Sequence, residues 1–258
     1  MKPNRLKEIW SRGEIAFGTW VTIGNPDVSE ILSHLGFDWL VFDTEHAPLS
    51  METVQHMIQA TSGTNIVPLI RVAWNDMVLI KLALDVGAYG VVVPWVNNRD
   101  DAIKAVKATR YPPKGLRGTG PRRAALYGLD REDYFRRVED ELVTIVQTET
   151  PEAIKNIDEI MTVEGVSACF IGPTDLTTSL GIRDQQDHPK FIEAIERVLD
   201  AGRRYKIPVG IMTYNDEQLR KAIERGFKFI SLSSDFSLLI RGARSFLEVA
   251  KKSIQPKV

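Results

Sequence analysis

The sequence predicts an α/β fold, a TIM-type (β/α)8 barrel that forms a single domain over residues 1–258. Its 258 residues and 43% hydrophobic content fit one large barrel domain. Eight short apolar segments alternate with helical segments. The apolar segments are continuous, as in Val91–Val93, which indicates strands buried on both faces. A doubly wound open sheet is the alternative, but no G-x-G-x-x-G motif follows the first predicted strand.

The predicted elements follow one another with few interruptions. A short amphipathic helix at 4–12 precedes the barrel. Strands are expected at 16–22, 39–43, 67–72, 90–93, 142–146, 168–171, 208–212 and 229–232. Helices are expected at 26–35, 50–59, 77–86, 100–109, 134–141, directly after Pro151, and at 190–205, 217–225 and 237–250. The longest irregular segment, 111–129, is rich in glycine, proline and arginine.

Composition and charge exclude several classes of protein. The net charge of −1 gives no general nucleic-acid or membrane footprint. The N-terminal segment has no signal-peptide core, and no apolar run approaches the roughly 20 residues of a membrane span. The one cysteine, Cys169, lies in an apolar strand, where burial disfavours a thiolate. We therefore expect a cytoplasmic protein without disulfides.

Two acidic residues follow neighbouring predicted strands within the stretch 142–181. Glu149 comes two residues after Gln147, and Asp175 follows the turn Gly172-Pro173-Thr174. In a parallel sheet, both carboxylates then lie at adjacent carboxyl ends, where they can hold one hard divalent cation. Free N–H groups around 172–175 can hold a carboxylate. The alternative is that both acids only cap helices or lie in surface loops.

The other predicted strand ends carry further polar residues. These are Thr22 and Gly24, Asp43, Glu45 and His46, Thr213 and Tyr214, and Ser233, Ser234 and Asp235. Arg71 lies within an apolar strand, so we expect either an ion pair with Asp43 or Glu149, or a cation that stabilises an oxyanion.

His46 directly follows a strand and has Asp43 and Glu45 beside it. Most isolated histidines are structural or exposed, but this position favours a general base, with a third metal ligand as the alternative. A Schiff-base aldolase would need a lysine at the carboxyl end of a strand. The predicted strands offer none there, so imine chemistry is disfavoured.

Five segments together resemble the HpcH/HpaI aldolase family. They are FDTEHAP at 42–48, IR at 70–71, ATRYPPKG at 108–115, VQTE at 146–149 and FIGPTDL at 170–176. The arginine-rich segment 117–128 is similar as well. The resemblance implies a metal-dependent class II pyruvate aldolase, of the kind that acts on 4-hydroxy-2-oxoheptanedioate or 2-dehydro-3-deoxyglucarate.

The resemblance also implies roles for individual residues. Glu149 and Asp175 would bind Mg²⁺, Mn²⁺ or Co²⁺, while Gln147 and Arg71 would contact the pyruvate moiety. His46 would belong to the acid/base machinery, with Asp43 supporting it. The pyruvate carboxylate would bind to backbone amides near Gly172, Pro173, Thr174 and Asp175.

The implied reaction is the reversible retro-aldol cleavage of a 4-hydroxy-2-oxoacid to pyruvate and an aldehyde, through a metal-stabilised pyruvate enolate. The implied assembly is a homo-oligomer, a hexamer built from three dimers that exchange the helix at 237–250. Three alternatives stay open. The first is an acyl-CoA lyase like the citrate lyase beta subunit, in which the basic segment 115–123 would bind the coenzyme A phosphates, although this segment is equally consistent with a subunit contact. The second is the decarboxylation of a 2-oxoacid such as oxaloacetate. The third is a barrel that only binds an oxoacid.

Overall fold

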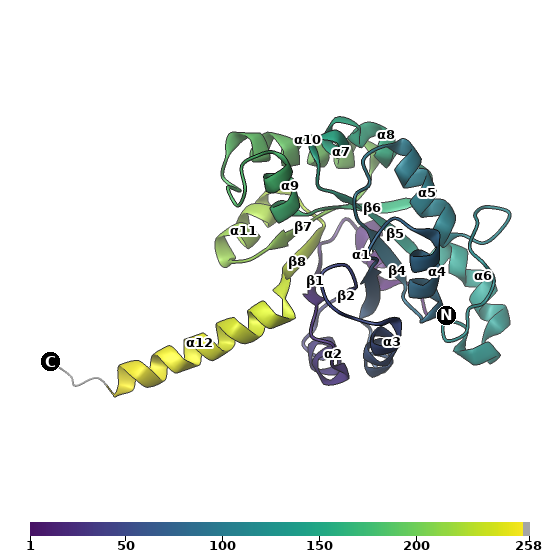
Figure 1. The fold of residues 1–258 in the computed structure, drawn as a ribbon, viewed down its shortest axis with the longest axis horizontal. Helices are drawn as coiled ribbons and strands as arrows, with labels where there is room; N and C mark the ends of the chain where they lie inside the picture. Colours follow the sequence, from purple (N-terminus) through teal and green to yellow (C-terminus); the bar gives the residue numbers. More distant parts are fainter. Residues whose placement is uncertain (255–258) are drawn as a thin grey trace.

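Eight parallel strands pair in chain order and close into a barrel in the computed structural model, which describes residues 1–254 (Figure 1). The strands are β1 (Ala16–Val21), β2 (Trp39–Asp43), β3 (Val67–Arg71), β4 (Gly90–Val93), β5 (Val143–Thr148), β6 (Val166–Ile171), β7 (Val209–Thr213) and β8 (Phe229–Ser234). Because β8 pairs with β1, the sheet has no free edge. The predicted TIM-type barrel is confirmed, and the open sheet is excluded. The last four residues of the predicted domain, 255–258, lie outside the described residues.

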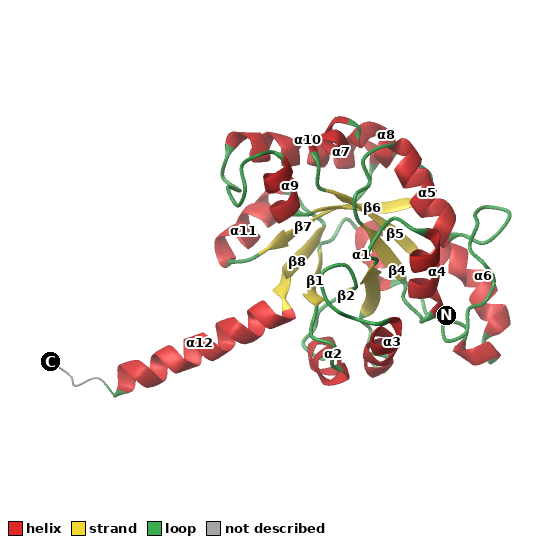
Figure 2. Ribbon diagram, in the orientation of Figure 1, coloured by secondary structure: helices red, strands yellow, loops and turns green. Residues whose placement is uncertain are grey.

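Helices connect the strands and surround most of the barrel (Figure 2). They are α1 (Arg5–Ser11), α2 (Pro26–Ser33), α3 (Met51–Ala60), α4 (Met77–Asp85), α5 (Arg99–Thr109), α6 (Arg131–Glu141), α7 (Pro151–Lys155), α8 (Ile157–Met161), α9 (Pro173–Ser179), α10 (Pro189–Tyr205), α11 (Asp216–Arg225) and α12 (Asp235–Ser253). A 3₁₀ turn, η1 (Leu126–Gly128), lies in the long irregular segment. Ser50 caps α3 by accepting the N–H of Thr53, and Pro151 stands in the first turn of α7.

The central stretch differs from its prediction in three places. The single helix expected after Pro151 is two short helices, α7 and α8, which meet at Asn156. Residues 173–179 form α9 where a loop was expected, because Pro173 at its start and Asp175 in its first turn both favour a helix N-terminus. Strand β5 runs on to Thr148, so Gln147 belongs to the strand and does not follow it.

Side chains that point into the barrel alternate with side chains that pack against the helices. On β2, Trp39 and Val41 belong to the inner cluster, whereas Leu40 and Phe42 belong to the outer one. On β5, Val143 and Ile145 are likewise inner residues. The inner cluster fills the end of the barrel where the strands begin. It includes the rings of Trp39 and Phe229, whose centroids are 4.3 Å apart. The barrel is therefore a packed core and not a channel.

The last helix, α12, projects away from the barrel (Figures 1 and 2). It begins at Asp235, two residues earlier than predicted, and extends to Ser253. Within residues 1–254, no helix is long and apolar enough to cross a membrane.

Candidate active site

Three polar side chains occupy the inward positions nearest the carboxyl ends of their strands. The two-residue period that places Val41, Leu69 and Ile145 inside the barrel also directs Asp43, Arg71 and Gln147 inward, two residues further along. Asp43 and Arg71 stand opposite each other in the register of β2 and β3. The strand pattern therefore brings a carboxylate, a guanidinium and an amide to the carboxyl end of the barrel.

Arg71 is held by two acids and an aromatic ring. Its Nε and Nη2 atoms donate to the two oxygens of Asp43 at 3.0 and 2.6 Å. Its Nη1 atom lies 3.2 Å from Oε2 of Glu45, an ion pair without hydrogen-bond geometry. The guanidinium carbon lies 4.3 Å from the ring centroid of Trp20. Of the two expected partners, Asp43 is confirmed, whereas no ion pair joins Arg71 to Glu149 within residues 1–254.

The two acids beside Arg71 respond differently to burial. Burial alone would raise the pKa of Asp43, but the hydrogen bonds and charge of Arg71 outweigh it, and that pKa lies below its ordinary value. Burial raises the pKa of Glu45 to about 7, because Arg71 opposes the shift only in part and Asp43 and Asp175 add negative charge. Glu45 is therefore an acid that can hold or release a proton near neutral pH.

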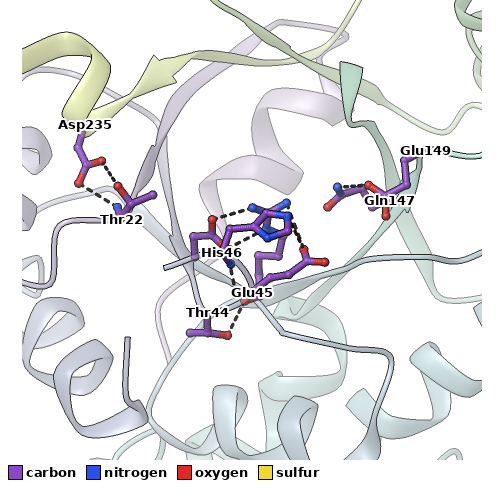
Figure 3. Close-up of polar contacts among 9 residues, drawn as sticks. Thr22, Thr44, Glu45, His46, Gln147, Glu149 and Asp235 are labelled. Carbon is purple, nitrogen blue, oxygen red and sulfur yellow. Dashed lines mark hydrogen bonds and ion pairs between the residues drawn. The ribbon is translucent and has the colours of Figure 1, made fainter. Parts of the chain in front are cut away.

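His46 lies at the edge of this group with 60% of its side chain exposed. Its Nε2 atom is 3.8 Å from Oε2 of Glu45, and Figure 3 shows the two side chains facing each other. Asp43 is bonded to the Glu45-His46 turn through backbone groups, since it accepts the N–H groups of Glu45 and His46 at 3.0 and 3.2 Å. The carboxylate beside the imidazole is thus Glu45, whereas Asp43 fixes the turn that carries it.

The other half of the site is assembled around Gly172. A Cβ atom at this position would lie 3.0 Å from Nε2 of Gln147, 3.0 Å from Oε2 of Glu149 and 3.5 Å from Oδ2 of Asp175. The three side chains therefore converge on one small volume, which only glycine leaves open. Gln147 donates its amide to Glu149 (Figure 3). The two acids predicted from neighbouring strands are brought together.

Glu149 is fixed from a second side by strand β4. The backbone N–H of Trp95, two residues beyond that strand, donates to Oε1 of Glu149 at 2.8 Å. Trp95 has a φ of 54°, in the left-handed region that a bulky residue rarely adopts. This conformation stores strain at the position that holds Glu149, as occurs at functional sites.

The donor set fits a divalent cation bound mainly by oxygen. Burial raises the pKa of Glu149 to about 7, and the charges of Asp175 and Glu45 add to this shift. A bound cation would offset the cost of burying the charge of Glu149 and would weaken its repulsion by Asp175 and Glu45. Buried Oε1 of Gln147 has no hydrogen-bond partner within the described chain. Within residues 1–254, no three acidic, histidine or cysteine side chains are grouped so that they could hold a metal ion. Glu149 and Asp175 offer two carboxylates, the type of ligand that hard divalent cations take.

Two contributors were missed as site residues. Glu45 was only one of several polar residues after a strand, although its place two residues beyond Asp43 was a usable signal. The N–H of Trp95 carried no sequence signal, because any residue except proline supplies one. The remaining polar strand ends form other contacts: Asp235 accepts the N–H groups of Thr22 and Ile23, and Thr174 pairs with Tyr214 through hydroxyl groups 3.2 Å apart.

Comparison with known proteins gives a consistent result. A family model described as HpcH/HpaI aldolase/citrate lyase matches residues 16–242. A 4-hydroxy-2-oxo-heptane-1,7-dioate aldolase from Shigella flexneri is 39% identical over 243 residues, which cover 94% of this chain and 91% of that protein. The crystal structure of an HpcH/HpaI aldolase/citrate lyase family protein from Burkholderia cenocepacia J2315 has a TM-score of 0.93 and 35% identity, covering 96% of this chain and 99% of that one. The citrate synthase SbnG has a TM-score of 0.85 and 28% identity, covering 96% and 98%.

Proposed function

The chain belongs to the HpcH/HpaI aldolase/citrate lyase family and is a carbon–carbon lyase, and from this premise we propose that it cleaves a 4-hydroxy-2-oxoacid reversibly to pyruvate and an aldehyde. A named relative supports the substrate class, because the retro-aldol cleavage of 4-hydroxy-2-oxo-heptane-1,7-dioate gives pyruvate and an aldehyde. The observation that carries the proposal is the convergence of Gln147, Glu149 and Asp175 on the space above Gly172.

We assign Glu149 and Asp175 as the protein ligands of a divalent cation such as Mg²⁺, Mn²⁺ or Co²⁺. When bound, the cation supplies positive charge that stabilises the oxygen of a pyruvate enolate. The carboxylate end of pyruvate would lie near the backbone amides at the start of α9, where unpaired N–H groups and the helix dipole favour an anion. Gln147 would orient the oxoacid through its amide.

Arg71 and His46 perform the remaining steps in this proposal. In cleavage, His46 takes the proton from the C4 hydroxyl group, and the electrons of the C3–C4 bond pass into the enolate as the aldehyde leaves. Arg71 faces the developing negative charge and is held rigid by Asp43 and Trp20. Protonation of the enolate at C3 then gives pyruvate. Glu45, beside His46, keeps the imidazole oriented.

Proton exchange of pyruvate tests this proposal without knowledge of the aldehyde. The protein would be incubated with pyruvate in D₂O, and the methyl signal would be followed by NMR with Mg²⁺ or Mn²⁺ and again with EDTA. We expect exchange that requires the metal, and a loss of at least about a hundredfold in Glu149→Gln. Glu152→Gln, an exposed change on α7, is the matched control.

Two results would count against the assignment. Undiminished exchange in Glu149→Gln would remove the metal role of that carboxylate. Wild-type protein that neither exchanges pyruvate nor cleaves a panel of 4-hydroxy-2-oxoacids would shift the assignment to another lyase of the family, or to a barrel that only binds an oxoacid.

The closest alternative is an acyl-CoA lyase, and the position of the basic segment 115–123 argues against it. Arg117 is fully buried and donates to Asp85 at 2.6 Å, and Arg123 donates to the carbonyl of Val86 at 3.1 Å. Both contacts lie at the C-terminal end of α4, at the end of the barrel where the strands begin. Within one chain, this segment is therefore remote from the candidate active site. Saturable inhibition of pyruvate exchange by free coenzyme A would favour the alternative.

We also propose that the protein assembles through α12, as a hexamer of three dimers that exchange this helix. Apolar side chains on α12 recur at spacings of three and four residues and are exposed in the single chain, among them Phe236, Leu239, Phe246 and Leu247. Such a stripe on a projecting helix is typical of a subunit interface. A reducing cytoplasm is the proposed compartment, since the one cysteine is buried and free.

A further inference from the structure

A cavity of about 700 Å³ lies at the end of the barrel where the strands begin, opposite the candidate active site. Its wall comes from the N-terminal segment, the connection from α3 to β3, the residues that lead into β4, and the segment 123–130. Pro68 and Tyr89 mark its position, because they stand at the start of β3 and directly before β4. Neither the sequence motifs nor the proposed reaction uses this space.

Arg123 contributes a positive charge to the lining of the cavity. Its Nη1 atom donates to the carbonyl of Val86 and its Nη2 atom donates to the hydroxyl of Ser62, both at 3.1 Å. The ion pairs within residues 1–254 do not include Arg123, and its ionisable neighbours there are Tyr127 and Tyr89. Burial lowers the pKa of Arg123, and only Tyr127 and Tyr89 weakly oppose the shift. An anion that binds beside this partly buried guanidinium would therefore stabilise its charge.

The backbone at Gly87 leaves room for the side chain of Arg123. Gly87 has a φ of 103°, and a Cβ atom there would lie 2.3 Å from Nη1 of Arg123. A glycine is thus required both by the backbone conformation and by the guanidinium that passes over it. Arg123 therefore packs closely over Gly87 and is only partly exposed.

The other charged groups of the cavity wall offset one another, so that its remaining charge is that of Arg123. Arg5 pairs with Asp38 at 2.9 Å, and the amino group of Met1 pairs with Asp130 at 2.9 Å and with Asp133 at 2.6 Å. Lys2 and Glu8 are exposed and line the rim. The remaining wall combines apolar residues, among them Ile58, Ile66 and Leu126, with the polar side chains of Thr61, Ser62, Thr64 and Asn65. An occupant that satisfies this wall has an acidic head and a hydrocarbon or aromatic body.

We propose that this cavity is a second binding site, which takes a small organic anion with an apolar body and uses Arg123 as its counter-charge. The site lies across the packed barrel core from Glu149 and Asp175, so its ligand does not compete with the oxoacid. The basic segment 115–123, which the sequence left open between coenzyme A and a subunit contact, thereby gains a role in ligand binding.

The anionic dye 8-anilinonaphthalene-1-sulfonate is a suitable probe, because it joins a sulfonate to an aromatic body. Titration of the folded full-length protein, followed by fluorescence, should show one saturable site per chain. We expect Arg123→Gln to weaken binding about tenfold, as for the loss of one charge-assisted hydrogen bond. The neighbouring change Arg122→Gln should leave the affinity unaltered, since Arg122 is exposed. Arg123→Lys should retain most of it.

Three further measurements distinguish an anion site at Arg123 from an apolar surface, from the active site and from a subunit contact. The uncharged analogue N-phenyl-1-naphthylamine should bind wild-type protein and Arg123→Gln equally, because it lacks the sulfonate. Pyruvate with Mg²⁺ should not displace the dye. Unchanged dye affinity in Arg123→Gln, with thermal melting confirming that the variant is folded, would overturn the proposal. So would displacement by pyruvate, or a change in oligomeric mass in Arg123→Gln without a change in affinity, which would make Arg123 a subunit contact.

Discussion

Asp43 connects the fold to the candidate active site through four hydrogen bonds. It holds Arg71 in a two-pronged ion pair and accepts the N–H groups of Glu45 and His46. One carboxylate therefore fixes both the guanidinium and the turn that carries the imidazole. Removing its charge leaves Arg71 buried with only Glu45 as a counter-ion.

We expect Asp43→Asn to lower the free energy of unfolding by about 3 kcal/mol at neutral pH, as for other broken buried ion pairs. The folded pKa of Asp43 lies below its ordinary value of 3.8, so its ionised form stabilises the fold above that value. The stability difference between wild type and variant should shrink as the pH falls through the folded pKa. Urea unfolding at a series of pH values measures this.

An exposed ion pair is the control for this prediction. Arg183 and Asp184 lie 3.6 Å apart with side chains 78% and 72% exposed, so Asp184→Asn should change stability by less than about 1 kcal/mol. An Asp43→Asn protein as stable as wild type at neutral pH would show that the pair with Arg71 does not support the fold.

Gly172 gives a second prediction at the residue scale. Gly172→Ala would place a methyl group 3.0 Å from both Gln147 and Glu149, so these side chains must shift. Because misplacing reacting groups by about 1 Å can reduce rates a hundredfold, we expect metal-dependent pyruvate exchange to fall at least about tenfold. Gly120→Ala, where nothing lies within 4 Å of the new methyl group, is the control. Equal exchange rates in the two variants would contradict the proposed crowding.

The sequence predicted most residues of the candidate site but not all of the contacts that they make. Asp43, Arg71 and Glu149 were identified because charged residues at the ends of apolar strands are conspicuous. The contacts of Glu45 were not predictable, since they depend on the direction of side chains at a turn. The hydrogen bond from the N–H of Trp95 to Glu149 was not predictable for a different reason. The direction of that N–H depends on the unusual φ angle of Trp95.

At the scale of elements, strands were easier to predict than short helices. A strand of this barrel is a buried apolar run, which composition alone reveals. The apolar run before Gln147 predicts a strand that ends at Val146, whereas β5 continues to Thr148. Helix α9 has only seven residues and begins at Pro173, directly after Gly172, and a Gly-Pro pair usually marks a turn. The division between α7 and α8 at Asn156 also left no clear signal, because apolar residues continue on both sides of it.

Helix α12 supports a prediction about assembly. We expect the double change Leu239→Glu and Phe246→Glu to reduce the mass of the oligomer in solution, because both side chains are exposed in the single chain, by 65% and 83%. Light scattering after size-exclusion chromatography measures the mass. Arg244→Gln, a polar change on the same helix, should leave the mass unaltered. A double variant with the wild-type mass would place the interface elsewhere.

At the scale of the whole molecule, the closed barrel protects its one thiol. Cys169 on β6 is fully buried, and its sulfur lies 2.7 Å from the hydroxyl oxygen of Thr148. Burial raises the pKa of Cys169 to about 12. We expect no reaction with the thiol reagent DTNB at neutral pH in the folded protein and complete reaction in guanidinium chloride. Rapid labelling under native conditions would show that β5 and β6 separate without global unfolding.

Long-range placement is the part of the molecule that local patterns described least well. The arginine-rich segment has no regular period, and nothing in its composition reveals at which end of the barrel it packs. Only the folded chain brings Arg117 onto Asp85 and Tyr111, and Arg123 over Gly87.

The position of α12 after the last strand of the barrel also has a consequence for synthesis. Strand β8 ends at Ser234, so every strand of the barrel leaves the ribosome before α12 does. The strands therefore become available for pairing in chain order and ahead of α12, and folding during synthesis commonly proceeds from the N-terminus. A nascent chain would thus expose the residues of the barrel strands before the apolar side chains of α12. This order lets the strands pair with one another before the apolar side chains of α12 can compete for them.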